Sequence, residues 1–271
     1  MSINHDRRKL LTLAGGLAVS GALPSIAQAA PAAARVVLGV TPLPPYYDII
    51  ELIQPKAAEL GLDLVVKKFE DTRQLNTLLA NGDLDANFFQ HVPYLEQYNK
   101  DNNLDLVVAA GVFIGLFGAY SRRFKKVEDL PEGALLVYPN DPSNSGRALD
   151  MFAKHRLLRL KDGAGIKATQ ADIIDNPKKF RFRGVEQPML VRTLDDADLV
   201  AINAPFVVAI GLNPLVDALI SEDKSVFVSS LVSRRDNVKS DGIVRLAQAV
   251  TSPEVKRLLE DKFQRSVRPV F

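Results

Sequence analysis

The sequence contains no cysteine and no tryptophan, and it has only three histidines among its 271 residues. Without cysteine, the chain can form no disulfide, thiolate zinc site, iron–sulfur cluster or thiol nucleophile. One of the histidines, His5, lies close to the N-terminus, which leaves too few for a histidine-rich metal centre. We therefore expect neither a metal nor a cofactor.

The chain also has almost no net charge. Its 34 basic side chains stand against 32 acidic ones, and the first 29 residues hold Arg7, Arg8 and Lys9 against Asp6 alone. The rest of the chain therefore carries equal numbers of both signs. A nucleic-acid-binding protein normally shows a basic face, so we expect no nucleic acid among the partners.

The amino-acid composition is that of a soluble globular protein, because 47% of the residues are hydrophobic and 24% are charged. The length fits one large domain or two lobes of roughly 100 to 130 residues each, enough to bury a sizeable core. No Walker loop, nucleophile elbow, zinc-protease motif or EF-hand pattern occurs in the sequence. The enzyme classes defined by those motifs are therefore not indicated.

The N-terminal segment has the pattern of an export signal. Basic residues are followed by an apolar run from Leu10 to Leu23, and Ala27 and Ala29 have the spacing of a cleavage site. The apolar run is shorter than the roughly 20 residues that cross a bilayer. We predict that residues 1–29 are an export signal and that residues 30–35 form a linker. The alternative is a buried N-terminal helix.

The pair Arg7-Arg8 resembles a twin-arginine signal, which exports chains that are already folded. Paired arginines also occur in general secretory signals, so both routes stay open. Either route places the working protein outside the cytoplasmic membrane, where no ATP or reduced nicotinamide is supplied. This location argues against most cofactor-dependent enzymes.

Strand-like and helix-like patterns alternate after the linker. Strand–helix–strand succession requires parallel pairing with right-handed crossovers, which predicts an α/β fold. In the first part of the chain we expect strands at residues 36–41, 62–69 and 84–88, and helices at residues 49–60, 75–79 and from Pro93 onward.

Residues 106–120 form an apolar stretch too long for one ordinary strand. We interpret it as a strand that passes from one lobe into another, so that residues 36–117 plus 228–271 form lobe 1 and residues 118–227 form lobe 2. Two lobes joined by crossing strands create a hinge and a ligand cleft. The later elements are expected as strands at 134–138, 181–185, 199–203 and 226–232, and helices at 145–158, 206–210, 243–250 and 253–263.

Residues 85–94 place aromatic rings, an amide and a histidine at the carboxyl end of a predicted strand, where open α/β sheets bind ligands. Alternation predicts that Asn87, Phe89 and His91 share one side of the strand. Pro93 at a helix start would place Tyr94 near them. The alternative is that Phe89 belongs to the core and that His91 is an ordinary loop residue.

A second polar segment, residues 139–147, follows a predicted strand and opens a helix, whose unpaired N–H groups suit an anion. Arg147 could hold a carboxylate with two parallel bonds, beside Asn144 as a neutral partner. Asn203 ends a further apolar strand, where its amide could contact an ammonium and a carboxylate group. The alternatives are a solvated arginine on a capped helix and turn chemistry at Asn203.

Five segments stand together in the order found in one known family. They are DANFFQHVPYL (85–95), PNDPSNSGRAL (139–149), NPKK (176–179), TLDDADLVAIN (193–203) and GLNP (211–214). From about Val36 to Phe271 the chain resembles the methionine-binding, NlpA/MetQ-type substrate-binding proteins of ABC importers. The resemblance implies a two-lobed periplasmic-binding-protein fold, type II-like, that captures a free amino acid as a monomer and delivers it to an inner-membrane permease with a cytoplasmic ATPase.

The resemblance also implies which residues bind the ligand. Phe89, His91 and Tyr94 would line the side-chain pocket, Arg147 and Asn144 would hold the carboxylate, and Asn203 would contact the α-amino and carboxylate groups. Three further positions differ from the family pattern. Thr72 stands where a pocket aromatic is expected, Ser229 stands where an asparagine is expected, and Tyr46 is a candidate replacement for the missing ring.

Family members are commonly lipoproteins anchored through a cysteine. Because this chain has none, we expect the mature protein to be free in the periplasm and not lipid-anchored. We predict a binding protein for methionine or a close analogue, which works by hinge closure and not by catalysis. The alternatives are the same fold with another small organic solute, and an exported α/β hydrolase using His91 with Asp85.

Overall fold

The computed structural model describes residues 33–263 and 266–271. They belong to one compact unit, Ala32–Phe271. The predicted export signal at residues 1–29 lies outside the described residues. Among the residues described, no helix combines the length and the hydropathy that crossing a bilayer requires.

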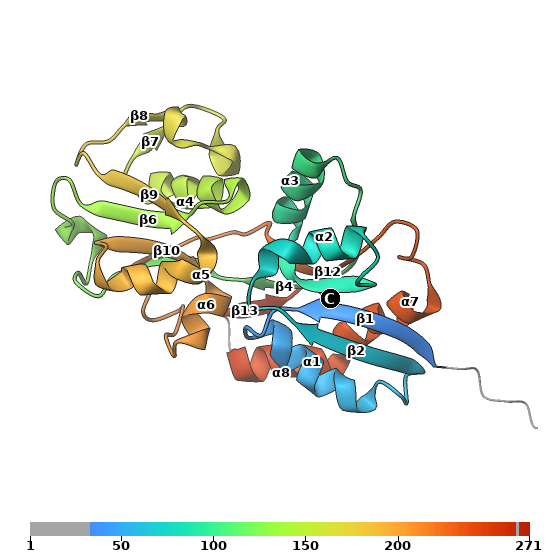
Figure 1. The fold of residues 1–271 in the computed structure, drawn as a ribbon. Helices are drawn as coiled ribbons and strands as arrows, with labels where there is room; N and C mark the ends of the chain where they lie inside the picture. The colour runs from blue at the N-terminus through green and yellow to red at the C-terminus, as the bar shows by residue number, and fades with distance from the viewer. Residues whose placement is uncertain (1–32, 264–265) are drawn as a thin grey trace, which may run out of the picture. The chain divides into compact units, whose positions relative to one another are not determined.

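Two sheets organise the unit, as the ribbon in Figure 1 shows. In the larger sheet β1 pairs in parallel with β2 and β3, whereas β12 runs antiparallel between β3 and β4. In spatial order its strands are β13 (Val267–Pro269), β4 (Val107–Gly115), β12 (Val228–Ser233), β3 (Ala86–His91), β1 (Ala34–Val40) and β2 (Leu62–Lys68).

We call this sheet and the helices packed on it the first lobe. Its core joins strand residues such as Leu38 and Phe88 to helix residues such as Ile49 and Leu246, all fully buried. The helical elements are α1 (Tyr46–Ile53), η1 (Gln54–Lys56), η2 (Thr72–Gln74), α2 (Leu75–Ala80), α3 (Val92–Asn102), α7 (Asp241–Val250) and α8 (Pro253–Phe263).

The smaller sheet and its helices form what we call the second lobe. Its spatial order is β11 (Ile220–Ser221), β5 (Phe117–Tyr120), β10 (Leu199–Asn203), β6 (Leu135–Pro139) and β9 (Arg181–Val185), with β7 (Arg159–Leu160) and β8 (Ile173–Asp175) as a separate pair. The helical elements are η3 (Val127–Asp129), α4 (Pro142–Lys154), η4 (Gly165–Lys167), η5 (Gln170–Asp172), α5 (Gln187–Leu190), η6 (Val191–Asp195) and α6 (Ala204–Ala209).

The long apolar stretch passes from one sheet to the other, as predicted. It divides at Leu116 into β4 of the first lobe and β5 of the second. The backbone N–H of Leu116 donates to Ser266 at 3.0 Å, and its carbonyl accepts from the N–H of Ala204 at 2.8 Å. The two-lobed α/β fold class is thus confirmed, whereas the lobe limits at residues 117 and 228 stay a prediction.

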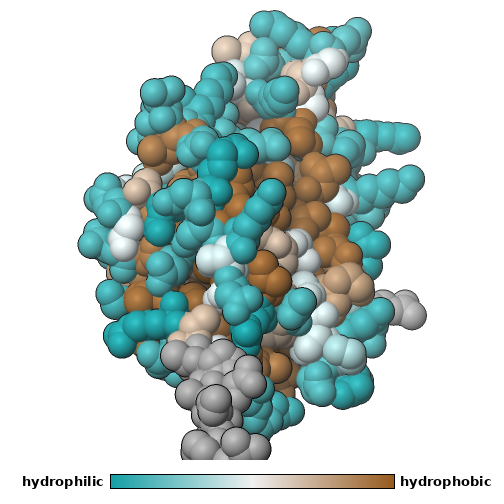
Figure 2. All heavy atoms as spheres, turned by 90° about the vertical axis from the view of Figure 1, so that its right-hand side faces the viewer, coloured by the Kyte–Doolittle hydropathy of each residue, from teal (hydrophilic) through white to brown (hydrophobic). Residues whose placement is uncertain are grey.

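The surface of the unit mixes both kinds of side chain. On the face shown in Figure 2, hydrophilic residues surround patches of hydrophobic ones. The most exposed large hydrophobic residue among those described is Val216, at 75%. Scattered apolar residues of this kind are normal on a protein surface and indicate no binding site there.

Candidate functional site

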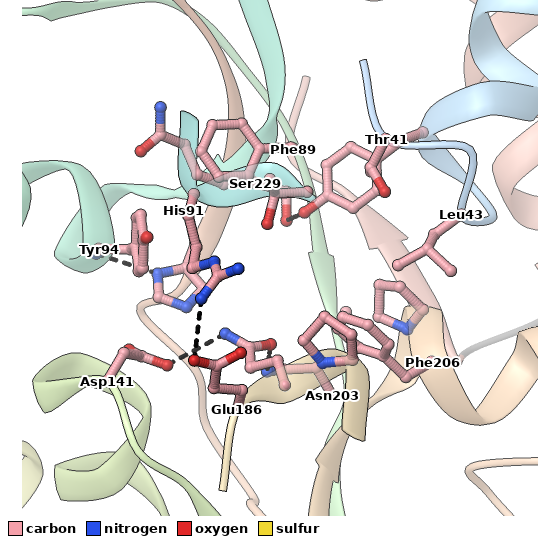
Figure 3. Close-up of a pocket in the computed structure, with 18 of the residues that line it drawn as sticks. Thr41, Leu43, Phe89, His91, Tyr94, Asp141, Glu186, Asn203, Phe206 and Ser229 are labelled. Atoms are coloured by element: carbon pink, nitrogen blue, oxygen red, sulfur yellow. Dashed lines mark hydrogen bonds and ion pairs between the residues drawn. The ribbon is translucent and has the colours of Figure 1, made fainter. Parts of the chain in front are cut away.

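A cavity of about 540 Å³ lies between the two lobes. Figure 3 shows Phe89, His91 and Tyr94 on one side of it, and Asp141 and Asn203 on the other. The structure brings eight of the nine predicted site residues to its walls, namely Tyr46, Thr72, Phe89, His91, Tyr94, Arg147, Asn203 and Ser229. The ninth, Asn144, is fully buried behind His91, whose ring its side chain contacts.

His91 ends β3 and caps α3. Its Nδ1 accepts a hydrogen bond from the backbone N–H of Tyr94 at 3.2 Å, and its Nε2 lies 3.0 Å from Oδ1 of Asn144 in the second lobe. The amide nitrogen of Asn144 donates to Asp141, so its oxygen is free to accept. This arrangement assigns the proton of neutral His91 to Nε2.

The surroundings of His91 also keep the ring uncharged. Burial, and to a lesser extent the positive charge of Arg147, lowers its pKa to about 4. The dyad that a hydrolase would need is not formed. Asp85 accepts a hydrogen bond from the backbone N–H of Val37 at 2.8 Å, and both ring nitrogens of His91 have other partners.

Arg147 lies on α4 with 3% of its side chain exposed. It makes a two-pronged clamp on the carboxylate of Glu222, a residue that the sequence did not indicate, whereas the prediction placed the carboxylate of a ligand there. Its Nε and Nη2 donate to the two carboxylate oxygens of Glu222, the former at 2.9 Å. Nη1 donates to Asn203 at 2.9 Å. The guanidinium carbon lies 4.6 Å and 4.1 Å from the ring centres of Phe117 and Phe227.

This pairing changes the electrostatics of the cavity floor. Glu222 neutralises Arg147, and among the described residues the second hydrogen on Nη1 has no acceptor. The floor can therefore offer a ligand one charge-assisted N–H, not two. Glu222 was missed because it follows the two-residue strand β11 and meets Arg147 across 75 positions of sequence.

Asn203 joins a network of amides and carboxylates. Its Nδ2 donates to Gln187 at 2.9 Å and to Asn144 at 3.2 Å, and Gln187 donates to Asp141 at 3.1 Å. Asp141 also caps α4 by accepting from the backbone N–H of Asn144 at 3.0 Å. Among the described residues, every group that donates to Asp141 is neutral, so no cation pairs with its carboxylate at the cavity wall.

Aromatic and small polar residues of the first lobe complete the walls. The hydroxyl of Tyr46 lies 2.8 Å from that of Ser229, and its ring meets Phe88 and Phe113 edge to face, with centres 4.9 Å apart. Burial raises the pKa of Tyr46 well above its usual range. Burial also raises the pKa of Tyr94, to about 12, so both hydroxyls stay protonated.

The predicted alternation along β3 is wrong for Asn87. A register shift between Ser230 and Leu231 of β12 interrupts the pairing with β3. The side chain of Asn87 therefore bonds to Asn76 and Gln90, each at 2.9 Å, and is not among the residues that line the cavity. A β-bulge of this kind depends on the partner strand, so the pattern of β3 alone does not reveal it.

Two lobes connected by crossing segments, with a cavity of aromatic and amide groups between them, define the class of two-lobed solute-binding proteins. Comparison with known proteins identifies the family. The family model described as NlpA lipoprotein matches residues 36–271. The chain belongs to this family, as the sequence motifs predicted.

Individual relatives carry more specific names. The D-methionine-binding lipoprotein MetQ of Salmonella typhimurium is 40% identical over 211 residues, covering 76% of this chain and 78% of that protein. A solved nutrient-binding protein from Burkholderia cenocepacia, bound to methionine, has a TM-score of 0.83 and 36% identity, covering 87% of this chain and 100% of the other. A periplasmic substrate-binding protein of an ABC transporter from Coxiella burnetii has a TM-score of 0.82 and 32% identity, with coverage of 87% and 100%.

The comparisons contradict one expectation, that the mature protein is free and not lipid-anchored. The family is a lipoprotein family, and relatives such as that of Salmonella typhimurium are named lipoproteins. The expectation rested only on the absence of cysteine from the sequence. Anchoring in lipoproteins concerns the N-terminal segment, which lies outside the described residues, so the fold offers no support for the expectation and we withdraw it.

Proposed function

We propose that this protein is the substrate-binding component of an ABC importer and that its ligand is a free amino acid, methionine or a close analogue. The observation that carries the proposal is the cavity of about 540 Å³ between the lobes, whose walls combine aromatic rings with amide and charged groups. Its volume lies within the range of small-molecule sites. A relative named as a D-methionine-binding lipoprotein and a solved relative bound to methionine support the same ligand.

The charges of the cavity fit a zwitterion. Arg147 is already neutralised by Glu222 and presents one further N–H from Nη1, which suits a single carboxylate oxygen. Asp141 supplies a negative charge that suits an ammonium group. A ligand with one charge of each sign therefore matches this end of the cavity better than a dicarboxylate, which would find Arg147 already neutralised and would face Asp141.

The aromatic walls fit the side chain of methionine. Phe89, Tyr94, Phe113 and Phe227 line the cavity, and a polarizable thioether packs well against aromatic rings. In this proposal Phe89, His91 and Tyr94 contact the ligand, as do Tyr46, Thr72 and Ser229. Asn144 acts by holding His91 and Asn203 in place and does not touch the ligand.

The proposed action is binding, not catalysis. A ligand that contacts both lobes binds the closed form better and shifts the population toward it, which presents a distinct surface to a membrane permease driven by an ATPase. The solved ABC-transporter binding protein from Coxiella burnetii supports such partners. We propose that the protein works as a monomer and without nucleic acid.

A thermal-shift panel of amino acids, sulfonates and short peptides tests the ligand class. A ligand present at roughly 100 times its dissociation constant should add about 2.7 kcal/mol to the free energy of unfolding. We expect stabilisation by methionine, in at least one of its two enantiomers, and recovery of the ligand unchanged. Stabilisation by sulfonates or peptides alone would contradict the proposal, and so would turnover of the ligand.

A further inference from the structure

An ion pair joins the two lobes at the mouth of the cavity. Arg73, in η2 of the first lobe, donates from Nη1 to Oε1 of Glu186 at 3.0 Å. Glu186 precedes α5 of the second lobe, and Figure 3 shows it on the side of the cavity opposite Phe89 and Ser229. The pair can form only when the lobes are close together.

Asp71 fixes the direction in which Arg73 points. One of its carboxylate oxygens accepts from Nε of Arg73 at 2.9 Å and from the backbone N–H at 3.1 Å, and the other accepts from Nη2 at 2.8 Å. The guanidinium is a rigid planar fork, so these bonds leave the Nη1 edge facing Glu186. A side chain that is already oriented loses less freedom when it forms a further pair.

Glu186 is connected to the cavity floor through its neighbour in the chain. Gln187 accepts from Asn203 at 2.9 Å and donates to Asp141 at 3.1 Å. Arg73, Glu186 and Gln187 all line the cavity. A displacement of the start of α5 that separates Glu186 from Arg73 would therefore also disturb the groups proposed to meet the charged ends of the ligand.

We propose that Asp71, Arg73 and Glu186 form a latch that holds the cavity closed, and that Arg73 thereby sets how long a ligand stays bound. The inference rests on the proposed function, since it concerns release from that same cavity. The latch acts on dissociation, because a ligand enters between open lobes, where the pair is not formed. The buried contact between His91 and Asn144, at 3.0 Å, also joins the lobes and keeps closure possible without the latch.

Stopped-flow kinetics with methionine and the variant Arg73→Gln test the latch. The two side chains are 67% and 50% exposed, and exposed ion pairs contribute little each, so we expect dissociation about two to five times faster. Association should become no slower, because loss of the pair leaves more of the ligand-free protein in the open form. Raising the salt concentration should speed dissociation from the wild type more than from the variant. The double variant with Glu186→Gln should dissociate no faster than either single variant.

The chain offers a matched control pair within the first lobe. Arg235 and Asp105 are 66% and 71% exposed, with Nε and Oδ2 2.7 Å apart. The variant Arg235→Gln removes a comparable pair without touching the mouth of the cavity, so its dissociation rate should equal that of the wild type. Equal rates for Arg73→Gln and Arg235→Gln would overturn the latch.

A measurement of the distance between the lobes tests the latch without any ligand. Because the chain has no cysteine, Lys100→Cys on α3 and Asp162→Cys in the second lobe would carry the only two spin labels. In the ligand-free protein, Arg73→Gln should broaden the distance distribution and shift it to longer values. If methionine fails to bind the wild type, the proposed function fails, and an unchanged distribution would independently overturn the latch.

Discussion

At the scale of single residues, the pair of Arg147 and Glu222 dominates the charge of the cavity floor. The two side chains are 3% and 10% exposed. Removing one partner of a buried pair leaves an uncompensated charge, which costs about 3 to 5 kcal/mol. We therefore expect Arg147→Ala to lower the free energy of unfolding by that amount, measured by urea denaturation.

Measuring the contribution of Arg147 to binding requires a second variant, one that does not leave Glu222 unpaired. Arg147→Met combined with Glu222→Gln removes both charges, so stability should largely return. Calorimetric affinity for the amino acid should stay at least about tenfold weaker, because the charge-assisted N–H on Nη1 is lost. Wild-type affinity in the double variant would remove Arg147 from the binding site.

The low pKa of His91 predicts that the stability of the folded protein depends on pH. The unfolded chain takes up a proton near the ordinary histidine value of about 6.5, whereas the folded protein does so only near 4. The free energy of unfolding should therefore fall as the pH falls from about 6.5 to 4, by up to about 3 kcal/mol from this residue. In urea denaturation series, His91→Gln should show a shallower decline over that window, and parallel curves would contradict the assignment.

At the scale of elements, most strands and helices could be predicted from hydrophobic periodicity and end signals. Residues 181–185 and 199–203 form β9 and β10 with the predicted limits. Helix α4 begins at Pro142, three residues before the predicted start, because the side chain of Asp141 caps it. The three-residue strand β13 was missed, since so short a strand forms only through its pairing with β4.

Site residues could be predicted where they lie in segments with a clear local pattern, and they were missed where only tertiary contacts place them. Phe89, His91 and Arg147 lie in segments whose local pattern marks a strand end or a helix start. Gln187 and Arg73 reach the cavity from short helical turns, and Glu222 meets Arg147 from the segment after β11. Their partners are distant in sequence. Tertiary packing brings them together, within the second lobe for Glu222 and Gln187 and between the lobes for Arg73, so no local pattern indicated them.

Helix α4, which carries Arg147, depends on a close backbone contact. A Cβ at Gly146 would lie 2.1 Å from the carbonyl oxygen of Ile166, and this backbone atom cannot rotate away. We expect Gly146→Ala to destabilise the protein by at least about 1 to 3 kcal/mol, measured as a lower Tm. Gly242→Ala in α7 is the comparison variant: its Cβ would lie 2.6 Å from a methyl group of Val36, and a side-chain atom can give way further than a backbone carbonyl, so its loss should be smaller. An equal loss in both variants would contradict this account.

At the scale of the whole molecule, the structure is that of two sheets whose connecting segments meet near Leu116. Contacts between the lobes lie both inside the cavity, at His91 and Asn144, and at its mouth, at Arg73 and Glu186. Closure thus brings groups of both lobes around a small ligand. This geometry explains why affinity and release are expected to respond to residues in both lobes.

Isothermal titration calorimetry with the two enantiomers of methionine tests the central claim most directly. The account predicts saturable binding of one methionine per chain, with the amino acid recovered chemically unchanged. Absence of binding by both enantiomers, in a protein that a different class of solute saturates, would contradict it.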